Sequence, residues 1–444
     1  MLPRCPRWSA FSLRKSARQK EVAMIFHDPF VGDIDCSEVQ PIIDRPIFQR
    51  LRFIKQLGLS YLIFPFANHT RFEHSIGAYG RTQHRTRLWR KWNIIDRDMA
   101  RDIEIYSLIH DIGHGPYSHV VEAVTAINHD ERGLELLNGL AKVIKQCGGN
   151  LENIKRLFSH RNNLFKAVHD KNLGTEKFDY LERDAAYTNS GQPQFRELPH
   201  RVKFVRGEIV VPYQDDLLDA AIGLQAFYMD MYKNIYLQPA CMVLQRLMQK
   251  LIFALMKESE ITEEQLWNMT DADLDTRILN SKQAWVKAGG GVIRNRQWPR
   301  VAISLKHRRF AESEENGDNN KRRLSVFPIG ARRMNGLARY FYKNPRRIAA
   351  MEREIEETFA FPQHSVLVVP ATDSHRFKAQ QIQVSRDGEI SSLDQWRPEG
   401  VSRLNEIALS YMCVRVAVEP EFREKMASRP VSREVVKLLL SKTS

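Results

Sequence analysis

Apolar residues recur three or four positions apart in several stretches of the first 260 residues, which is the spacing of one helix face. In the stretch 44–58, DRPIFQRLRFIKQLG, they are Ile47, Leu51, Ile54 and Leu57. Asp44 is suited to cap a helix, Pro46 to occupy its first turn and Gly58 to end it. The pattern therefore predicts one helix over this stretch.

A second stretch, 100–113 (ARDIEIYSLIHDIG), has the same periodicity, and Gly113 is expected to stop the helix. Its apolar face consists of Ile105, Leu108, Ile109 and Ile112. Residues 131–148 and 217–258 also have mainly helical patterns. Roughly residues 22–260 are therefore predicted to form an all-helical domain.

The pattern changes after residue 260, where short apolar runs separated by turn residues are typical of strands. Strands are predicted at 301–307, 365–370 and 381–384, with a turn at Asp387–Gly388 and a helix over 335–358. The polar stretch 307–325 is predicted to be a mobile loop. The fold class is therefore mainly α, with a smaller α+β region over 261–444.

Composition narrows the class of protein. No run approaches about eighteen consecutive apolar residues, so a membrane span is not expected. The five cysteines form no C-x-x-C pair, which favours a reducing, cytoplasmic location over a disulfide framework. The formal net charge of +14 indicates either a generally basic surface or a polyanionic partner.

The first residues form a separate basic segment. Residues 1–20 contain Arg and Lys but no acidic residue, as an organelle presequence does. A misassigned start upstream of Met24 would give the same pattern. Residues 1–21 are therefore expected to be a disordered basic tail.

The stretch 108–119, LIHDIGHGPYSH, concentrates candidate chemistry at the end of a predicted helix. His110 and Asp111 are adjacent, and imidazole and carboxylate together bind divalent metals well. Gly113, Gly115 and Pro116 then break the helix, which allows the two later histidines to turn back toward one site. Further candidate ligands and acid–base groups are His74, His114, His119, His129 and Glu176.

These motifs together resemble the HD-domain phosphohydrolases, and more narrowly the deoxynucleoside triphosphate (dNTP) triphosphohydrolases, both bacterial dGTPase-like and vertebrate SAM-and-HD-domain enzymes. The likeness runs through HDPFVGDI, FQRLRFIKQLG, FPFANHTRFEHSIG, HDIGHGPYSH, HDERG and EKFDYLERD, within about residues 24–240. It implies metal-dependent water attack on the α-phosphorus of a dNTP, releasing deoxynucleoside and inorganic triphosphate.

The resemblance also implies roles for individual residues around the metal. The metal ligands would be His74, His110, Asp111 and Glu176, holding Mn, Fe, Mg, Co, Ni or Zn. Glu176 stands where the family typically has Asp, so its longer side chain requires the backbone or the metal to shift. The catalytic set would be His114, His119, Glu122 and His129, with Glu122 supporting His119 as the acid for the leaving 5′ oxygen.

Substrate contacts follow from the same resemblance. They would be Gln56, Leu57, Arg71, Lys177, Tyr180, Asp184 and Tyr236. Arg71 and Lys177 would offset phosphate charge. The likeness frays at Tyr228 and Gln238, where relatives carry Arg and His, and Lys233 is a candidate to compensate.

Some relatives bind an activating nucleotide between subunits. Asp44, Gln49 and Arg52 match the residues that would read guanine there, whereas Met24 stands where a phosphate-binding lysine would be. The resemblance also implies a homodimer or homotetramer.

Two other functions stay open from the sequence. One is an HD phosphohydrolase that acts on another nucleotide. Glu176, Tyr228 and Gln238, which differ from the residues of the family, leave this function open. The other is a regulatory module with weakened catalysis that binds single-stranded nucleic acid through basic stretches such as 84–92, HRTRLWRKW. Product analysis separates the first alternative, and salt-dependent nucleic-acid binding without turnover would indicate the second.

Overall fold

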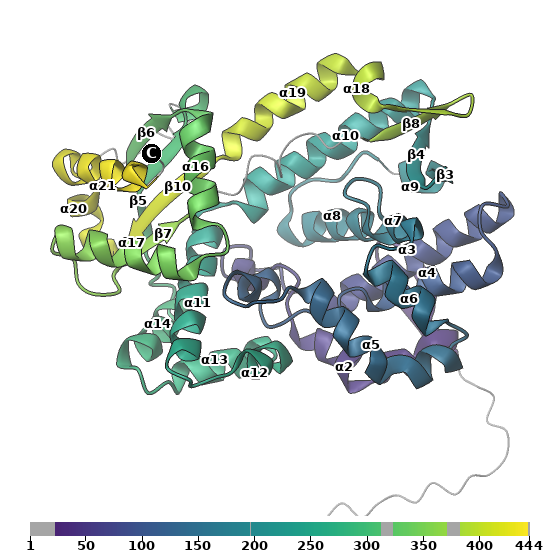
Figure 1. Cartoon of the computed structure of the whole chain (residues 1–444), viewed down its shortest axis with the longest axis horizontal. Helices are drawn as coiled ribbons and strands as arrows, with labels where there is room; N and C mark the ends of the chain where they lie inside the picture. The colour runs from purple at the N-terminus through teal and green to yellow at the C-terminus, as the bar shows by residue number, and fades with distance from the viewer. Residues whose placement is uncertain (1–22, 196, 312–322, 371–381, 443–444) are drawn as a thin grey trace, which may run out of the picture.

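Helices form most of the chain, which the computed structural model describes for residues 23–195, 197–311, 323–370 and 382–442 (Figure 1). Three small sheets accompany them, so the mainly α fold class is confirmed. The expected basic tail at 1–21 and the centre of the expected loop at 307–325 lie outside the described residues. Among the helices within these ranges, none is long and apolar enough to cross a membrane.

Three helices frame the region of the histidine motifs: α3 (Arg71–Lys91), α4 (Arg97–Ile109) and α8 (Thr175–Thr188). Thr70 and Glu73 start α3 with a capping box, in which each side chain bonds the other residue's backbone N–H. Gly77 lets α8 approach α3, because a Cβ there would lie 2.2 Å from the Asp179 carboxylate. Their inner faces contribute to one large hydrophobic core.

The prediction for residues 44–58 is wrong in its details. The stretch contains only α2 (Pro46–Gln49) and a 3₁₀ turn over Arg50–Phe53, and Asp44 follows the C-terminus of α1 (Gln40–Ile43) rather than capping a helix start. The backbone then extends and pairs with the segment before α3: Arg71 N donates to Ile54 O at 2.9 Å. This pairing, which joins distant residues, overrides the local helical periodicity.

The other predicted helices of this half are present. They are α5 (His129–Gln146), α10 (Asp215–Met231) and α11 (Pro239–Lys257), with a π-helical turn over Tyr232–Tyr236 between the last two. The same half also contains strands that the sequence did not suggest: β1 (Ile25–Asp28), β2 (Gly32–Asp35), β3 (Lys203–Val205) and β4 (Glu208–Pro212). The helical unit is therefore not free of strands.

A four-stranded sheet organises the C-terminal region, in the order β6-β5-β10-β7. Its strands are β5 (Arg300–His307), β6 (Ser325–Ile329), β7 (Val366–Val369) and β10 (Cys413–Val418). Alternate residues of β7 enter different cores, Leu367 with α11 and Val368 with the helices of the other face. Helices thus cover both faces of the sheet, as its apolar strands require.

Helices α16 (Ala331–Phe341) and α17 (Pro345–Thr358) pack against this sheet (Figure 1). They replace the single helix predicted over 335–358, because the chain turns between them at Lys343, whose φ is +42°. The predicted strands at 301–307 and 365–370 are confirmed as β5 and β7.

The chain then returns to the first unit. Strand β8 (Gln383–Arg386) pairs in parallel with β4, and β9 (Glu389–Ser392) follows across the predicted turn, where Asp387 and Gly388 both have positive φ. After the short α18 (Leu393–Trp396), α19 (Pro398–Ala408) runs beside α10 (Figure 1). The division near residue 260 stays a prediction, and residues 383–408 pack on elements that precede it.

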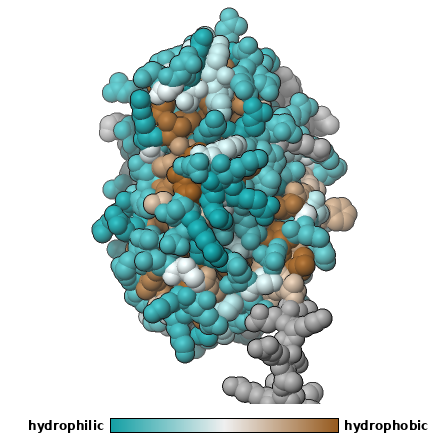
Figure 2. Space-filling model, turned by 90° about the vertical axis from the view of Figure 1, so that its right-hand side faces the viewer, coloured by the Kyte–Doolittle hydropathy of each residue, from teal (hydrophilic) through white to brown (hydrophobic). Residues whose placement is uncertain are grey.

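The remaining elements are short or peripheral. They are α6 (Leu151–Phe158), α7 (Lys166–His169), α9 (Leu198–Arg201), α12 (Glu263–Asn268), α13 (Asp271–Leu279), α14 (Ala284–Arg294), α20 (Arg423–Ala427) and α21 (Arg429–Ser441). On the face shown in Figure 2, hydrophilic side chains dominate and hydrophobic ones form separate patches. Patches of that kind are ordinary on soluble proteins.

Candidate active site

His74, His110 and Asp111 form a buried group whose ligand atoms all lie within 4.8 Å of one another. His74 lies in the first turn of α3, and His110 and Asp111 directly follow the last residue of α4. Each of the three is at most 5% exposed. Adjacent residues can face one point here because the helix ends between Ile109 and His110.

Hydrogen bonds fix which nitrogen of each imidazole faces this group. His110 Nδ1 bonds Ser107 O at 2.7 Å, and His110 Nε2 is buried without a hydrogen-bond partner among the described residues. His74 Nδ1 bonds Asp179 Oδ2 at 2.8 Å. Both rings therefore turn Nε2 toward Asp111, the orientation in which outer hydrogen bonds hold metal-binding histidines.

Glu176, near the N-terminus of α8, reaches the same group from the opposite side. Its Oε2 lies 3.3 Å from His110 Nε2, and its Oε1 lies 2.7 Å from Nδ1 of His169. His169 was not foreseen from the sequence. Its contact shows how the longer glutamate side chain is held extended toward the histidines.

The charges of these residues suit a divalent cation. Burial lowers the pKa of His110, so its imidazole is neutral, and burial of Asp111 is outweighed by Arg71, which pairs with it at 2.7 Å and holds the carboxyl pKa well below its usual range. The charge and hydrogen bond of His169 lower the pKa of Glu176 to about 2 despite its burial. Two imidazoles and two carboxylates with an unpartnered Nε2 fit a divalent metal.

A second group of polar residues lies next to the first: His114, His119, Glu122 and His129. Glu122 Oε1 accepts from His129 Nδ1 at 2.5 Å and from His119 Nδ1 at 3.0 Å. The rings of His114 and His129 are stacked 3.9 Å apart. Gly113 permits this stacking, since a Cβ there would lie 2.0 Å from the His129 carbonyl oxygen.

The two groups open into one cavity of about 370 Å³. Its lining includes twelve of the predicted site residues, of which eleven are Gln56, Leu57, Arg71, His74, Asp111, His114, His119, His129, Glu176, Tyr180 and Asp184. Tyr236 also lines it and donates from its hydroxyl to Asp184 Oδ2 at 2.7 Å. The predicted residues His110 and Glu122 are not part of the lining. Most of the residues predicted from separate motifs thus meet at one place.

Comparison with known proteins agrees with this geometry. No family model matches the chain. A protein of Acanthamoeba polyphaga mimivirus described as HD domain-containing is 36% identical over 207 residues, which are 39% of this chain and 45% of that protein. Deoxynucleoside triphosphate triphosphohydrolase SAMHD1 of Gallus gallus is 42% identical over 118 residues, 25% of this chain and 18% of that protein. The chain therefore matches about half or less of these curated relatives.

A crystal structure of a phosphohydrolase from Bacteroides thetaiotaomicron shares the fold. It covers 89% of this chain and 99% of its own, with a TM-score of 0.66 and 21% sequence identity. Over part of its length, the chain is therefore similar to proteins described as HD domain-containing and as dNTP triphosphohydrolases.

Not every predicted site residue reaches the cavity. Lys177, expected to bind triphosphate, is 2% exposed, donates to Lys171 O at 2.5 Å and lies over the Tyr228 ring at 3.5 Å. Burial lowers the pKa of Lys177 to about 7. Gln238 caps α11 by accepting from Cys241 N, and Lys233 is exposed. Of the arginine and lysine side chains in the described residues, only Arg71 lines the cavity, and His169, whose pKa is raised to about 9 by Glu176, lines it as well.

The residues matched to an activating nucleotide lie on another part of the surface. Asp44 and Arg52 are exposed, Gln49 donates to Ile43 O at 2.8 Å, and Arg52 covers the Phe72 ring at 3.5 Å. Gln49 Oε1 also accepts from Arg52 Nε at 2.8 Å. All three are absent from the lining of the cavity that contains the histidines.

The basic stretch 84–92 forms the C-terminal half of α3. Arg85 and Trp89 within it are buried, and Arg85 donates to the carbonyl oxygens of Ala167 and Leu173. Two of its large side chains thus stabilise the core instead of lying on a surface that a polyanion could reach.

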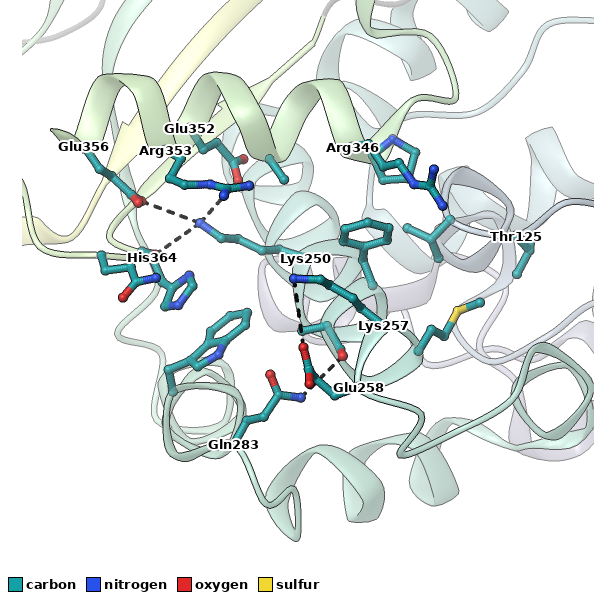
Figure 3. Close-up of a pocket in the computed structure, with 18 of the residues that line it drawn as sticks. Thr125, Lys250, Lys257, Glu258, Gln283, Arg346, Glu352, Arg353, Glu356 and His364 are labelled. Carbon is teal, nitrogen blue, oxygen red and sulfur yellow. Dashed lines mark hydrogen bonds and ion pairs between the residues drawn. The ribbon is translucent and has the colours of Figure 1, made fainter. Parts of the chain in front are cut away.

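A larger cavity of about 1010 Å³ lies between α11, α14 and α17 (Figure 3). Lys250 is held there by Glu352 at 3.2 Å and Glu356 at 3.8 Å, and His364 stacks on Trp285. These charged groups are paired with one another, whereas the smaller cavity is lined by His114, whose two ring nitrogens are buried without a hydrogen-bond partner among the described residues.

Several residues that support the site were not predicted from the sequence. His69 Nε2 bonds Asp184 Oδ1 at 2.7 Å, and Asp179 binds both His74 and Arg183. Asp179 lies three residues after Glu176, on the same face of α8, and that spacing was the available signal.

Proposed function

We propose that this protein hydrolyses dNTPs to deoxynucleoside and inorganic triphosphate in a metal-dependent reaction, by water attack on the α-phosphorus. The observation that carries the proposal is the meeting of two groups at one cavity: the buried His74, His110 and Asp111 with Glu176 beside them, and the histidines that Glu122 joins. The likeness to SAMHD1 proteins supports dNTPs as the substrate class.

His74, His110, Asp111 and Glu176 would hold the ion. A bound divalent ion polarises a phosphate oxygen and lowers the pKa of water, which supplies a nucleophile at neutral pH. The buried pairing of Arg71 with Asp111 keeps Asp111 ionised without the ion and places a guanidinium beside the expected phosphate position. The identity of the ion stays a prediction among Mn, Fe, Mg, Co, Ni and Zn.

His119 is the residue best placed to protonate the leaving 5′ oxygen. Its Nδ1 bonds Glu122, so the proton to be transferred is on Nε2, and its side chain is 65% exposed at the mouth of the cavity. The hydrogen bond to Glu122 fixes the orientation of the His119 ring. Burial and the charge of Arg71 lower the pKa of His114 well below its usual range, and the neutral ring would keep one N–H to donate to phosphate.

The opposite wall would bind the sugar. Asp184 accepts from both His69 and Tyr236, and a 3′-hydroxyl would join this network. Tyr180 offers an aromatic face beside Asp184, and Gln56 with Leu57 would close the space that a 2′-hydroxyl needs. Selection for deoxyribose over ribose is the expected result.

Product analysis tests the proposal. Purified protein is incubated with each dNTP, singly and mixed, with Mn²⁺, Mg²⁺, Fe²⁺ or Co²⁺, and products are resolved by ion-pair chromatography. Deoxynucleoside and tripolyphosphate in equal amounts are expected, and Asp111→Asn should abolish them. Asp102→Asn is the matched control, because Asp102 is a buried carboxylate of α4, the helix that precedes Asp111, and binds Asn150 and Asn153 instead.

A second substrate class is favoured by one observation. The Lys177 ammonium group lies over the Tyr228 ring and donates to Lys171 O instead of lining the cavity. The cavity therefore offers fewer positive charges to a triphosphate. Release of orthophosphate from another nucleotide would indicate that alternative. Activity only in dNTP mixtures would support an activating nucleotide, and a subunit assembly, expected as dimer or tetramer, would appear in light scattering.

Nucleic-acid binding is a third candidate function, which the net charge of +14 supports. It predicts binding of a single-stranded oligonucleotide that weakens steeply with salt. Binding of this kind without turnover of any nucleotide would favour it over hydrolysis.

A further inference from the structure

The turn that leads to His119 has an unusual backbone. Tyr117 and Ser118 are consecutive non-glycine residues with φ of +55° and +58°. Side chains make this left-handed region unfavourable, and such residues persist only where their surroundings hold them. Something outside the turn must therefore stabilise it.

Asp271, the first residue of α13, makes that contact. It is 7% exposed, and its two carboxylate oxygens accept from two different backbone amides: Oδ1 from Tyr117 N at 2.6 Å and Oδ2 from Lys55 N at 2.9 Å. The amides lie 154 and 216 residues away in the sequence. One side chain thus joins three distant segments of the chain.

Both segments that Asp271 holds carry residues of the cavity. Lys55 precedes Gln56 and Leu57, and Tyr117 precedes Ser118 and His119. Ser118 Oγ donates to Lys55 O at 2.9 Å and accepts from Arg71 Nε at 2.9 Å. Since Arg71 also binds Asp111, a continuous set of bonds runs from Asp271 to the metal group.

Neighbouring contacts attach the same end of α13 to the site. Arg50 donates to Met269 O at 2.8 Å and to His114 O at 2.5 Å. The Tyr117 hydroxyl donates to Asp275 Oδ1 at 2.7 Å, one helical turn after Asp271. Asp271 thus bonds the backbone after the Gly115–Pro116 break, and Arg50 links the backbone before the break to Met269, which precedes α13.

We infer that Asp271 is a positioning residue for the hydrolysis reaction, holding the His119 turn and the Gln56–Leu57 segment in register from a helix outside the cavity. The inference rests on the proposed function for its kinetic consequence. The expected protection of the two backbone amides from hydrogen exchange does not depend on the proposed function.

The test compares three variants at a temperature where circular dichroism shows each to be folded. Asp271→Asn keeps the shape, but a carboxamide has one acceptor oxygen for two N–H groups; Asp271→Ala removes both acceptors. Asp273→Asn is the matched control, because Asp273 caps the same helix through Thr270 and touches neither segment of the cavity.

We expect kcat to fall about 10- to 100-fold in Asp271→Asn, because small displacements of catalytic groups have effects of this size. The fall should be larger in Asp271→Ala. Mn²⁺ affinity should stay within about twofold, because the proposed ligands lie in α3, directly after α4 and in α8, and Asp271 bonds the Lys55 and Tyr117 amides instead. Asp273→Asn should change neither. A general loss of structure would lower Mn²⁺ affinity together with kcat, which separates it from positioning.

Hydrogen exchange provides the readout that needs no substrate. The amides of Lys55 and Tyr117 should exchange faster in both Asp271 variants and unchanged in Asp273→Asn. Unchanged exchange, or a kcat within about twofold of wild type in Asp271→Ala, would overturn the inference. A wild-type protein that hydrolyses no dNTP would instead refute the proposed function and leave the exchange result to decide the role of Asp271.

Discussion

Replacing Asp179 with Asn should weaken metal binding although Asp179 is not a ligand. Asp179 is fully buried and accepts from His74 Nδ1 at 2.8 Å and from Arg183 at 2.9 and 3.0 Å. The charges of Arg183 and His74 outweigh its burial and hold its carboxyl pKa well below the usual range. Asn has the same shape but no charge, and its amide group would face one of these donors.

The magnitude follows from what each partner loses. Removing the carboxylate behind a metal-binding histidine typically costs about 10- to 100-fold in metal affinity, or about 1.4–2.7 kcal/mol. Stability should fall by about 1–3 kcal/mol, which is less than the cost of isolating a buried charge, because Arg183 keeps Asp28 at 2.7 Å. The loss of metal affinity should therefore exceed what unfolding can explain.

Competition with a fluorescent chelator measures Mn²⁺ affinity, and urea unfolding measures stability. Asp102→Asn again serves as the control, since it changes a buried carboxylate that binds amide groups away from the metal. A folded Asp179→Asn protein with wild-type Mn²⁺ affinity would refute the argument that Asp179 orients His74.

Three further outcomes are expected. His169→Ala should weaken Mn²⁺ binding about tenfold, but less so in a Glu176→Asp background, whose shorter side chain has already left His169; equal losses in both backgrounds would contradict the support that we assign to His169. Glu122→Gln should lower kcat about 100-fold while chelator competition shows unchanged Mn²⁺ affinity, and a parallel loss of both would place Glu122 in the metal site instead of behind His119. Burial raises the pKa of Asp271 from 3.8 to about 6, so the folded state binds its proton more tightly, and its contribution to stability should decline by about 3 kcal/mol between pH 4 and pH 6 and stay constant above; urea unfolding of wild type and Asp271→Asn should show this difference, and a gap independent of pH would speak against it.

The residues of the site were easier to predict than the contacts that hold them. Local motifs identified His74, His110 and Asp111, since each lies in a short, distinctive stretch with its own helix boundary. Asp271 could not be found in this way, because its partners are more than 150 residues away and its own surroundings resemble an ordinary helix start.

The fold shows the same limit of local patterns. The stretch 100–113 folds as its periodicity predicts, because its apolar face packs into the core along its whole length. The stretch 44–58 has the same periodicity but extends after Phe53, because backbone pairing with 69–71 replaces the helical hydrogen bonds. The three- to five-residue strands escaped detection because so few residues cannot establish an alternating pattern.

The parallel pairing of β4 with β8 bears on how the protein is made. Val210 pairs with Gln383, so the edge of β4 stays open until 173 more residues have left the ribosome. At ordinary synthesis speeds of roughly 5–20 residues per second this takes about 9–35 s. During that time the unpaired edge of β4, with the apolar residues Val210 and Val211, can pair with strands of other chains. Shortened chains that end before β8 should therefore aggregate, and a nascent chain should gain from a chaperone that covers β4.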